Sequence, residues 1–219
     1  MLLYYITDRS QFPGTDSQRR DLLLQKILEA ASAGIDYIQL REKDLSGHAL
    51  ESFAKEAAQI IHDSCSSTRL LINSRTDVAL AVEADGVHLT STDISPAEVR
   101  KIWRLARGPH QPIIAVSCHT EDEVIAAGRT SDRGAADTHP AADFVVFGPV
   151  FEKPGAGQIA GIDQLRQACR HRIPVLALGG VTAENADLCI EAGASGIAGI
   201  RLFQENDIAE IVKKLRAPK

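Results

Sequence analysis

The feature that most constrains this chain is the regular alternation of short apolar runs with longer amphipathic segments along its 219 residues. Continuous apolar runs such as FVVF and VLAL are typical of strands covered on both faces, as in a parallel sheet. The expected strands are Leu2–Thr7, Tyr37–Leu40, Arg69–Ile72, Gly86–Leu89, Ile113–Ser117, Phe144–Phe147, Val175–Leu178 and Gly196–Ile200. With helices between them and no break in composition, they predict a single (β/α)8 TIM barrel that occupies residues 1–219 as one domain.

Helix boundaries in the sequence support this pattern. Ser95 precedes Pro96 and is followed by Glu98, which is a capping-box arrangement with proline at the first helical position. Thr120 and Thr182 each lie where a helix should begin after a strand. The expected helices are Asp21–Ala33, Ala49–Ser64, Pro96–Ala106, Glu121–Gly128, Ile162–Arg170, Ala183–Ala192 and Asp207–Leu215, with a further short one at Arg75–Val82.

One segment departs from the alternation. Residues 129–142 are polar, contain glycine and proline, and exceed the usual length of a helix-to-strand connection. Such a connection falls on the barrel face opposite the catalytic loops. We therefore expect a surface insertion with little regular order.

Composition excludes several classes of protein. The net charge is −5 with both signs interspersed, so no basic footprint for nucleic acid is present. No apolar run approaches the roughly 20 residues that span a bilayer, and Leu2–Thr7 lacks the basic segment and cleavage site of a signal peptide. The four cysteines lie far apart without a CxxC pair. We expect a cytoplasmic enzyme with reduced thiols that binds neither membranes nor nucleic acid.

Polar residues follow nearly every predicted strand, at the barrel end where active sites form. Gly179 and Gly180 come after a buried strand, so backbone N–H groups and the start of the next helix can converge on a phosphate. Gly199 and Arg201 follow the last strand and would complete the phosphate-binding corner. The alternative is that these glycines only fit tight turns.

A second set of polar residues follows the second strand. Arg41 and Lys43 could hold a diphosphate by charge-assisted hydrogen bonds, and Gln39 points the same way by alternation. The alternative is an ion-pair network in which the two cations pair with Glu42 and Asp44.

Three further residues near the fourth and fifth predicted strands could take part in the chemistry or support it. Asp93 could ligate Mg²⁺, although a lone aspartate at this position is more often a helix cap. His119 could shuttle a proton or donate a hydrogen bond to substrate, with a capping role as the alternative. His88 lies within a predicted strand and suits a supporting role in the barrel interior.

Together these stretches resemble the thiamine-phosphate synthase family, including its TenI-type thiazole tautomerase branch. The likeness runs in order over nearly the whole chain, and its motifs are specific as a set although each is weak alone. The matching segments are YYITD (4–8), QLREK (39–43), IN-R-D (72–77), DGVHL with a later Asp (85–93), SCH (117–119), FGPVF (147–151), ALGGVTAEN (177–185) and EAGASGIA (191–198).

The resemblance implies a barrel in which a pyrimidine diphosphate loses pyrophosphate and the nitrogen of a thiazole phosphate captures the resulting cation. It assigns Asp93 to Mg²⁺, Ser117 to pyrophosphate and Gly180 to the thiazole phosphate. The pyrimidine diphosphate would be bound by Gln39, Arg41, Lys43 and Asn73. We expect Lys43, Ser117 and His119 to act in catalysis.

The chain also departs from the synthase pattern. Ser74 stands where the family has its second magnesium-binding aspartate, and Ala156 where a lysine would contact the diphosphate. Thr90 and Arg201 replace a usual glycine and serine, and Lys153 and Arg201 could partly compensate. Each lost charge-assisted contact weakens binding by roughly 1.5–3 kcal/mol, which is about tenfold or more in affinity.

Three functions follow from these observations. The first is the Mg²⁺-dependent synthase, which we favour on the breadth of the retained motifs. The second is a metal-free thiazole tautomerase, for which His119 occupies the position of the proton-shuttling histidine. The third is a non-catalytic barrel that binds phosphorylated ligands. The sequence does not fix the oligomeric state, and a homodimer is the assembly to test first.

Overall fold

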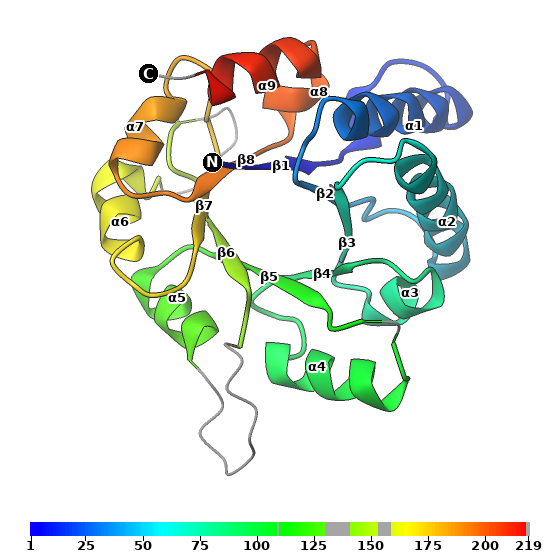
Figure 1. Ribbon diagram of the computed structural model, residues 1–219, viewed down its shortest axis with the longest axis horizontal. Coiled ribbons are helices and arrows are strands. Elements are labelled where there is room, and N and C mark those ends of the chain that lie inside the picture. The colour runs from blue at the N-terminus through cyan, green and yellow to red at the C-terminus, as the bar shows by residue number, and fades with distance from the viewer. Residues whose placement is uncertain (109, 130–140, 153–158, 218–219) are drawn as a thin grey trace. The chain divides into compact units, whose positions relative to one another are not determined.

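The computed structural model describes residues 1–108, 110–129, 141–152 and 159–217. Eight parallel strands follow one another in the order β1 to β8 of a closed barrel, so the predicted (β/α)8 TIM barrel is confirmed (Figure 1). Every strand boundary lies within one residue of its predicted position. The strands are β1 (Leu2–Ile6), β2 (Tyr37–Leu40), β3 (Arg69–Asn73), β4 (Gly86–Leu89), β5 (Ile113–Cys118), β6 (Phe144–Phe147), β7 (Val175–Ala177) and β8 (Gly196–Gly199).

Helices alternate with these strands as predicted, with differences at several places. The first helix begins at Asp16 and not at Asp21, because Thr15 and Gln18 form a capping box that we did not anticipate. A 3₁₀ turn (η1) and a short helix (α8) were also not anticipated. The helical elements are η1 (Arg9–Gln11), α1 (Asp16–Ser32), α2 (Gly47–Asp63), α3 (Thr76–Ala81), α4 (Pro96–Leu105), α5 (Glu121–Gly128), α6 (Gly161–Ala168), α7 (Ala186–Glu191), α8 (Arg201–Gln204) and α9 (Ile208–Arg216).

By its internal contacts the chain divides into two compact units. The terminal unit comprises Met1–Val87 and Gly199–Lys219, and the central unit comprises His88–Ala198. That the whole chain behaves as one domain stays a prediction.

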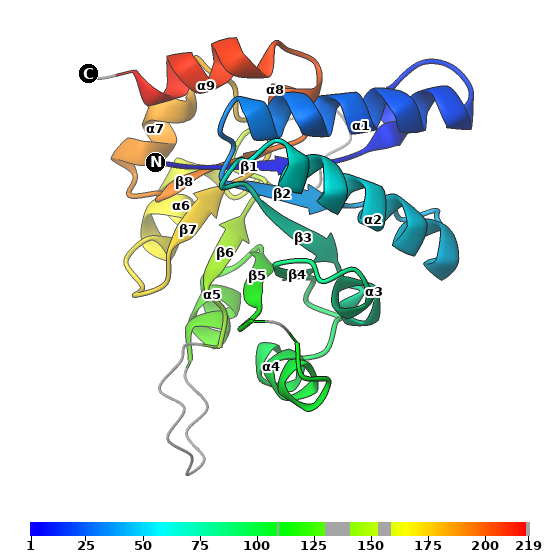
Figure 2. The same cartoon turned by 45° about the vertical axis from the view of Figure 1, so that its right-hand side comes forward.

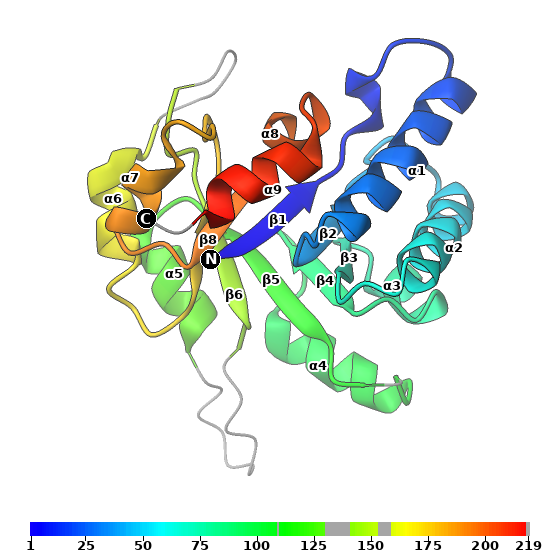
Figure 3. The ribbon, with the colours of Figure 1, turned by 45° about the horizontal axis from the view of Figure 1, so that its top comes forward.

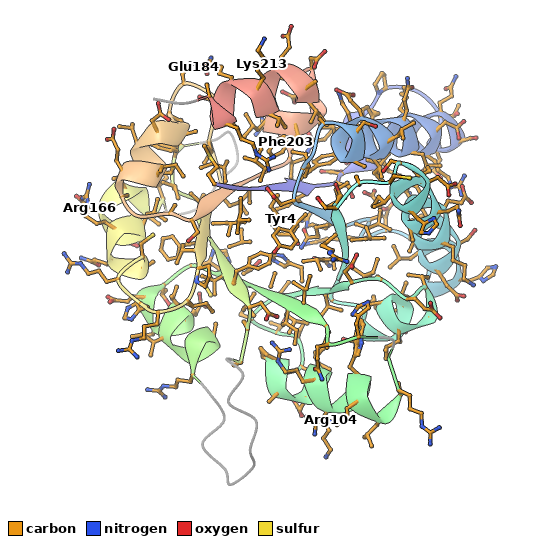
Figure 4. The ribbon with its side chains drawn as sticks, viewed as in Figure 1. Tyr4, Arg104, Arg166, Glu184, Phe203 and Lys213 are labelled. Atoms are coloured by element: carbon orange, nitrogen blue, oxygen red, sulfur yellow. The ribbon has the colours of Figure 1, made fainter. Side chains whose placement is uncertain are left out.

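In the terminal unit, the register of β1, β2 and β3 sets which side chains face inward. Ile6 pairs with Gln39, which in turn pairs with Leu71. Tyr4 and Tyr37 occupy the same face and pack edge to face at 5.9 Å, and Tyr4 lies on the inner side of the strands in Figure 4. By alternation Gln39 therefore shares the inner face with these aromatic rings.

The opposite face of these strands is covered by helices. Helices α1 and α2 lie side by side (Figure 2), and α9 runs beside β1 (Figure 3). Tyr5 points toward this layer, where its ring meets Phe203 and its hydroxyl donates to Gln204 at 2.9 Å. This side of the terminal unit is therefore a packed layer of strands and helices.

In the central unit, β5, β6, β7 and β8 pair in parallel with a continuous register. Ser117 pairs with Val146, and Leu176 lies between Val146 and Gly196. The capping box predicted at Ser95 and the N-cap predicted at Thr120 are both present and start α4 and α5, and the Thr120 cap is also a capping box, with Glu123. The strand ends of this unit therefore lie at the predicted positions, although α7 begins later than predicted.

Two further predictions bear on the surface. Residues 130–140, most of the predicted polar insertion, lie outside the described residues. Among the helices of the described ranges, none is long and apolar enough to cross a membrane.

Candidate active site

The end of β2 brings together a buried amide and two cations in the terminal unit. Gln39 is only 1% exposed, and its Nε2 donates to no group among the described residues. A buried amide without a partner is costly, because it has lost its hydrogen bonds to water. Asn73 ends β3 on the same face, and its amide donates to the Ser74 hydroxyl at 3.1 Å. Gln39 thus has an unused donor at a strand end.

The two cations after β2 are not paired with their sequence neighbours. Glu42 and Asp44 both form ion pairs with Arg9, at 3.1 Å and 2.6 Å respectively. The side chains of Arg41 and Lys43 contact no acceptor in the part of the chain that the structure describes. The alternative of a local ion-pair network among residues 41–44 is therefore wrong, and both positive charges stay available.

Arg9 lies at the centre of this arrangement, with a side chain that is 6% exposed. Its guanidinium also contacts Asp16 at 3.0 Å. Burial raises the pKa of the Glu42 carboxyl, while hydrogen bonds from Thr7 and Arg9 oppose that shift. The same guanidinium lowers the pKa of Asp44 by donating hydrogen bonds to it.

Ser74, which replaces the expected second magnesium ligand, has a left-handed backbone with φ of 60°. L-residues seldom adopt this conformation, although aspartate and asparagine are enriched in it. The backbone at this position therefore suits the aspartate of the family pattern as well as the serine that is present.

In the central unit, Asp93 has a structural role in its loop. Its Oδ2 accepts hydrogen bonds from the Thr90 N–H at 2.6 Å and from the Thr90 hydroxyl at 2.9 Å. The helix that follows is capped by Ser95, so the interpretation of Asp93 as a helix cap was wrong. Across the described ranges no group of three or more His, Cys, Asp or Glu side chains could hold a metal ion.

Ser117 and His88 form a polar pair at the end of β5. His88 Nε2 lies 2.7 Å from the Ser117 hydroxyl, and His88 is only 2% exposed. The supporting role expected for His88 is consistent with this contact. The histidine fixes the rotamer of a hydroxyl that would otherwise turn freely.

His119 is held differently, on the exposed rim after β5. Its Nδ1 hydrogen bonds to the carbonyl oxygen of Gly148, and its backbone N–H donates to Glu123. Because a carbonyl oxygen can only accept, Nδ1 carries the proton, and Nε2 of the neutral ring is left as an acceptor. Among the described residues Nε2 has no hydrogen-bond partner, so it can accept a hydrogen bond from a ligand.

The loop after β7 is shaped by its two glycines. Gly179 and Gly180 have φ of 93° and 65°, which favour glycine. A Cβ on Gly179 would lie 2.6 Å from Pro149, and one on Gly180 would lie 2.7 Å from Phe151. Close packing against the loop after β6 thus requires both glycines, as the tight-turn alternative supposed.

The same loop leaves backbone donors unused. The N–H groups of Gly179, Gly180 and Val181 have no acceptor among the described residues. Thr182 does not cap α7 as predicted, because its N–H donates to Asn185 at 2.8 Å and the helix begins one residue after that asparagine. Any anion here would be bound by these loop donors and not by a long helix.

The remaining predicted residues are placed as follows. Arg201 begins α8 in the terminal unit and is exposed, and its side chain has no partner among the described residues. Gly199 ends β8, where a Cβ would lie 3.0 Å from Leu202. Lys153 and Ala156 lie outside the described residues.

The sequence places Thr7 among the polar residues at the strand ends, but it predicts neither the contacts of Thr7 nor a role for Arg9. The Thr7 hydroxyl donates to Glu42 at 2.6 Å and accepts from the Arg41 N–H at 3.0 Å. The YYITD motif contains Thr7, but no local pattern links Arg9 to carboxylates more than 30 residues later.

Comparison with known proteins agrees with this fold. The family model for thiamine monophosphate synthase matches residues 3–203. A Geobacter sulfurreducens protein provisionally named as a thiamine-phosphate synthase is 40% identical over 200 residues, covering 90% of this chain and 83% of that protein. The thiamine-phosphate synthase of Methanocella arvoryzae is 33% identical and covers 98% of this chain and 93% of its own length.

A solved structure agrees as well. Thiamine phosphate pyrophosphorylase from Pyrococcus furiosus superposes with a TM-score of 0.77 at 28% identity, covering 98% of this chain and 93% of that chain. The chain belongs to the thiamine monophosphate synthase family.

Proposed function

We propose that this chain is a transferase that forms thiamine phosphate from a pyrimidine diphosphate and a thiazole phosphate. The bond between the pyrimidine methylene carbon and the diphosphate oxygen breaks. The thiazole nitrogen then forms a bond to that carbon, and pyrophosphate leaves with the electron pair. No proton is transferred in the net step, so the protein mainly has to stabilise charge on the leaving group and align the two substrates.

Each unit supplies residues suited to one part of this task. In the terminal unit, cations and amides would bind the diphosphate and the pyrimidine. In the central unit, hydroxyl and backbone donors would bind phosphate. The proposed diphosphate ligands of the terminal unit are Gln39, Arg41, Lys43 and Asn73. The proposed phosphate ligands of the central unit are Ser117, Gly179 and Gly180. Lys153, Gly199 and Arg201 stay further ligands proposed from the sequence alone.

The observation that carries this proposal is the pair of uncompensated charges after β2. Arg41 and Lys43 have no carboxylate partner among the described residues, because Arg9 binds the two acids beside them. Guanidinium and ammonium groups form their strongest hydrogen bonds with carboxylates and phosphates. Two such groups beside the unpartnered Gln39 amide suit a diphosphate ester.

Magnesium fits the protein residues poorly. Position 74 is serine, and one oxygen of Asp93 already accepts two hydrogen bonds from its own loop. Mg²⁺ commonly binds through one or two carboxylates together with substrate phosphates and water. We therefore expect Mg²⁺ to bind only together with the diphosphate substrate, and weakly to the free protein.

A second candidate function rests on His119. Its Nδ1–H···O=C bond to Gly148 leaves Nε2 as a base, which suits proton transfer in a thiazole tautomerase. That reaction needs a phosphate site and a histidine, but neither a metal nor a diphosphate.

The two functions are separated by one assay. Purified protein is given the pyrimidine diphosphate with each thiazole phosphate tautomer, with and without Mg²⁺. Pyrophosphate release with the aromatic tautomer supports the synthase. Interconversion of the tautomers in EDTA without pyrophosphate release supports the tautomerase, and ligand binding without turnover supports the non-catalytic barrel.

His119→Asn sharpens this assay. An asparagine amide can replace the Nδ1 donor to Gly148, but it offers no base in place of Nε2. Tautomerisation should fall by about a hundredfold or more, the usual range for general base catalysis. Thiamine phosphate formation should change by less than about tenfold, since the transfer step needs no base.

A further inference from the structure

The loop after β2 carries its charges in strict alternation, as Arg41, Glu42, Lys43 and Asp44. If these four groups paired among themselves, no positive charge would remain for an anionic ligand. The structure avoids this outcome by means of a residue from another loop. Arg9 is the N-terminal residue of η1 and lies after β1 in the sequence.

Arg9 binds both carboxylates at once. Its Nη1 lies 3.1 Å from Glu42 Oε2 and 2.6 Å from Asp44 Oδ1, and its Nη2 lies 2.8 Å from Asp44 Oδ2. The Arg9 backbone N–H also donates to Glu42 at 3.1 Å. Only a planar fork of donors can bind two carboxylates in this way, so lysine could not replace it fully.

Thr7 extends this contact to the backbone of the loop. Its hydroxyl donates to Glu42 Oε1 and accepts from the Arg41 N–H. Glu42 is 2% exposed, whereas the side chain of Asp44 is 70% exposed. Glu42 is therefore fixed inside the protein, but without Arg9 the Asp44 carboxylate would be free to turn toward Lys43 or Arg41.

We infer that Arg9 is a positioning residue for anion binding, because it sequesters Glu42 and Asp44 and so leaves Arg41 and Lys43 unpaired. It touches no substrate in this role. The inference rests on the proposed function only in taking diphosphate as the anion that these two cations bind. The loop between β1 and α1, which contains Arg9, thereby contributes to substrate affinity.

Calorimetric titration with inorganic pyrophosphate tests this inference. Arg9→Met should weaken pyrophosphate binding by tenfold or more, and should raise KM for the pyrimidine diphosphate while KM for the thiazole phosphate stays within twofold. Arg216→Met is the matched control, since Arg216 pairs with Asp36 elsewhere in the terminal unit. It should bind pyrophosphate as the parent protein does.

Rescue distinguishes charge sequestration from a merely structural role. In the triple variant Arg9→Met, Glu42→Gln, Asp44→Asn, neither of the two carboxylates adjacent to Arg41 and Lys43 in the sequence remains to compete for them, so affinity should return to within threefold of the parent protein. A purely structural role predicts no recovery, because the arginine contacts are still missing. Should Arg9→Met not fold, Arg9→Lys is the substitute, with an expected three- to tenfold loss and the same rescue by Asp44→Asn.

Three results would overturn the inference. If the parent protein binds pyrophosphate and folded Arg9→Met binds it equally well, Arg9 has no such role while the proposed function stands. If folded Arg9→Met loses affinity but the triple variant does not regain it, the loss is structural. A parent protein that binds no pyrophosphate would overturn the diphosphate site itself, and the inference with it.

Discussion

The two units of this chain offer an anion two different environments. At the strand ends of the terminal unit the donors are full positive charges, left unpaired because Arg9 binds the neighbouring acids. In the central unit the donors described above are neutral. They are the hydroxyl of Ser117 near the end of β5 and the backbone N–H groups of Gly179, Gly180 and Val181 after β7. A charged donor is available to an anion only if no acidic side chain pairs with it, whereas a backbone donor is available only if its loop keeps the right conformation. Mutation should therefore affect them in different ways.

The largest effect is expected in the loop after β7, where the backbone conformation determines anion binding. Gly180→Ala combines a left-handed backbone with a Cβ placed 2.7 Å from Phe151. Left-handed strain and overpacking together should destabilise the protein by about 2–4 kcal/mol and abolish detectable binding of the thiazole phosphate. Urea unfolding and a binding titration measure the two effects.

Gly161→Ala is the matched control for this substitution. Gly161 has φ of 78°, yet a Cβ there would meet no atom of the described residues within 4 Å. The free energy of unfolding should therefore fall by about 1–2 kcal/mol, from backbone strain alone. Equal losses in the two variants would show that the loop after β7 is not closely packed.

A smaller effect is expected in the loop after β2, where the charges of two side chains determine anion binding. Arg41→Met or Lys43→Met should weaken pyrophosphate binding by roughly 1.5–3 kcal/mol, which is about tenfold or more. The free energy of unfolding should hardly change, because neither side chain has a partner among the described residues. Lys55→Met, on an exposed ion pair of α2, is the control and should leave pyrophosphate binding unchanged.

A gain of function tests the position where the family pattern is broken. Ser74→Asp should fold, since aspartate tolerates the φ of 60° found there. A restored carboxylate, best combined with Ala156→Lys, should raise Mg²⁺-dependent turnover by about tenfold. A rise in metal affinity without a rise in turnover would show that the metal is not limiting.

The smallest effect concerns pH. Arg9 lowers the pKa of Asp44 below its unfolded value of about 3.9. This carboxylate therefore contributes stability above that pH, and the contribution is lost as the pH falls through the lowered pKa. Because Asp44 is largely exposed, Asp44→Asn should cost no more than about 1 kcal/mol at pH 7.

The same measurement at acid pH shows in which direction the contribution of Asp44 to stability changes with pH. The difference in the free energy of unfolding between the parent protein and Asp44→Asn should shrink as the pH falls below the unfolded pKa of about 3.9, in urea unfolding curves recorded at pH 7 and at successively lower pH. Asp163→Asn, on an exposed ion pair of α6, serves as the control. A difference that grows at low pH would contradict the assignment.

The fold was predictable because buried strands reveal themselves in sequence. Runs such as FVVF have no polar face to solvate, so β6 was predicted at its observed boundaries. The start of α1 was missed because Thr15 and Gln18 form a cap outside the apolar repeat. The cap at Thr182 failed because Asn185 binds its backbone and delays the helix.

The site was less predictable than the fold, because partners of charged groups are chosen in three dimensions. The residues after β2 were found from strand alternation and motif. The sequence offered Arg41 and Lys43 as partners for Glu42 and Asp44, since they are adjacent. Arg9 replaces them because β1 and β2 are paired and bring their following loops together.

The central claim is that charged donors of the terminal unit bind the diphosphate and backbone donors of the central unit bind the thiazole phosphate. Steady-state kinetics of Arg41→Met/Lys43→Met test it most directly, with each substrate varied in turn. We predict a KM for the pyrimidine diphosphate raised about a hundredfold or more, with KM for the thiazole phosphate within twofold of the parent value. Equal increases in both constants, or none in either, would contradict the account.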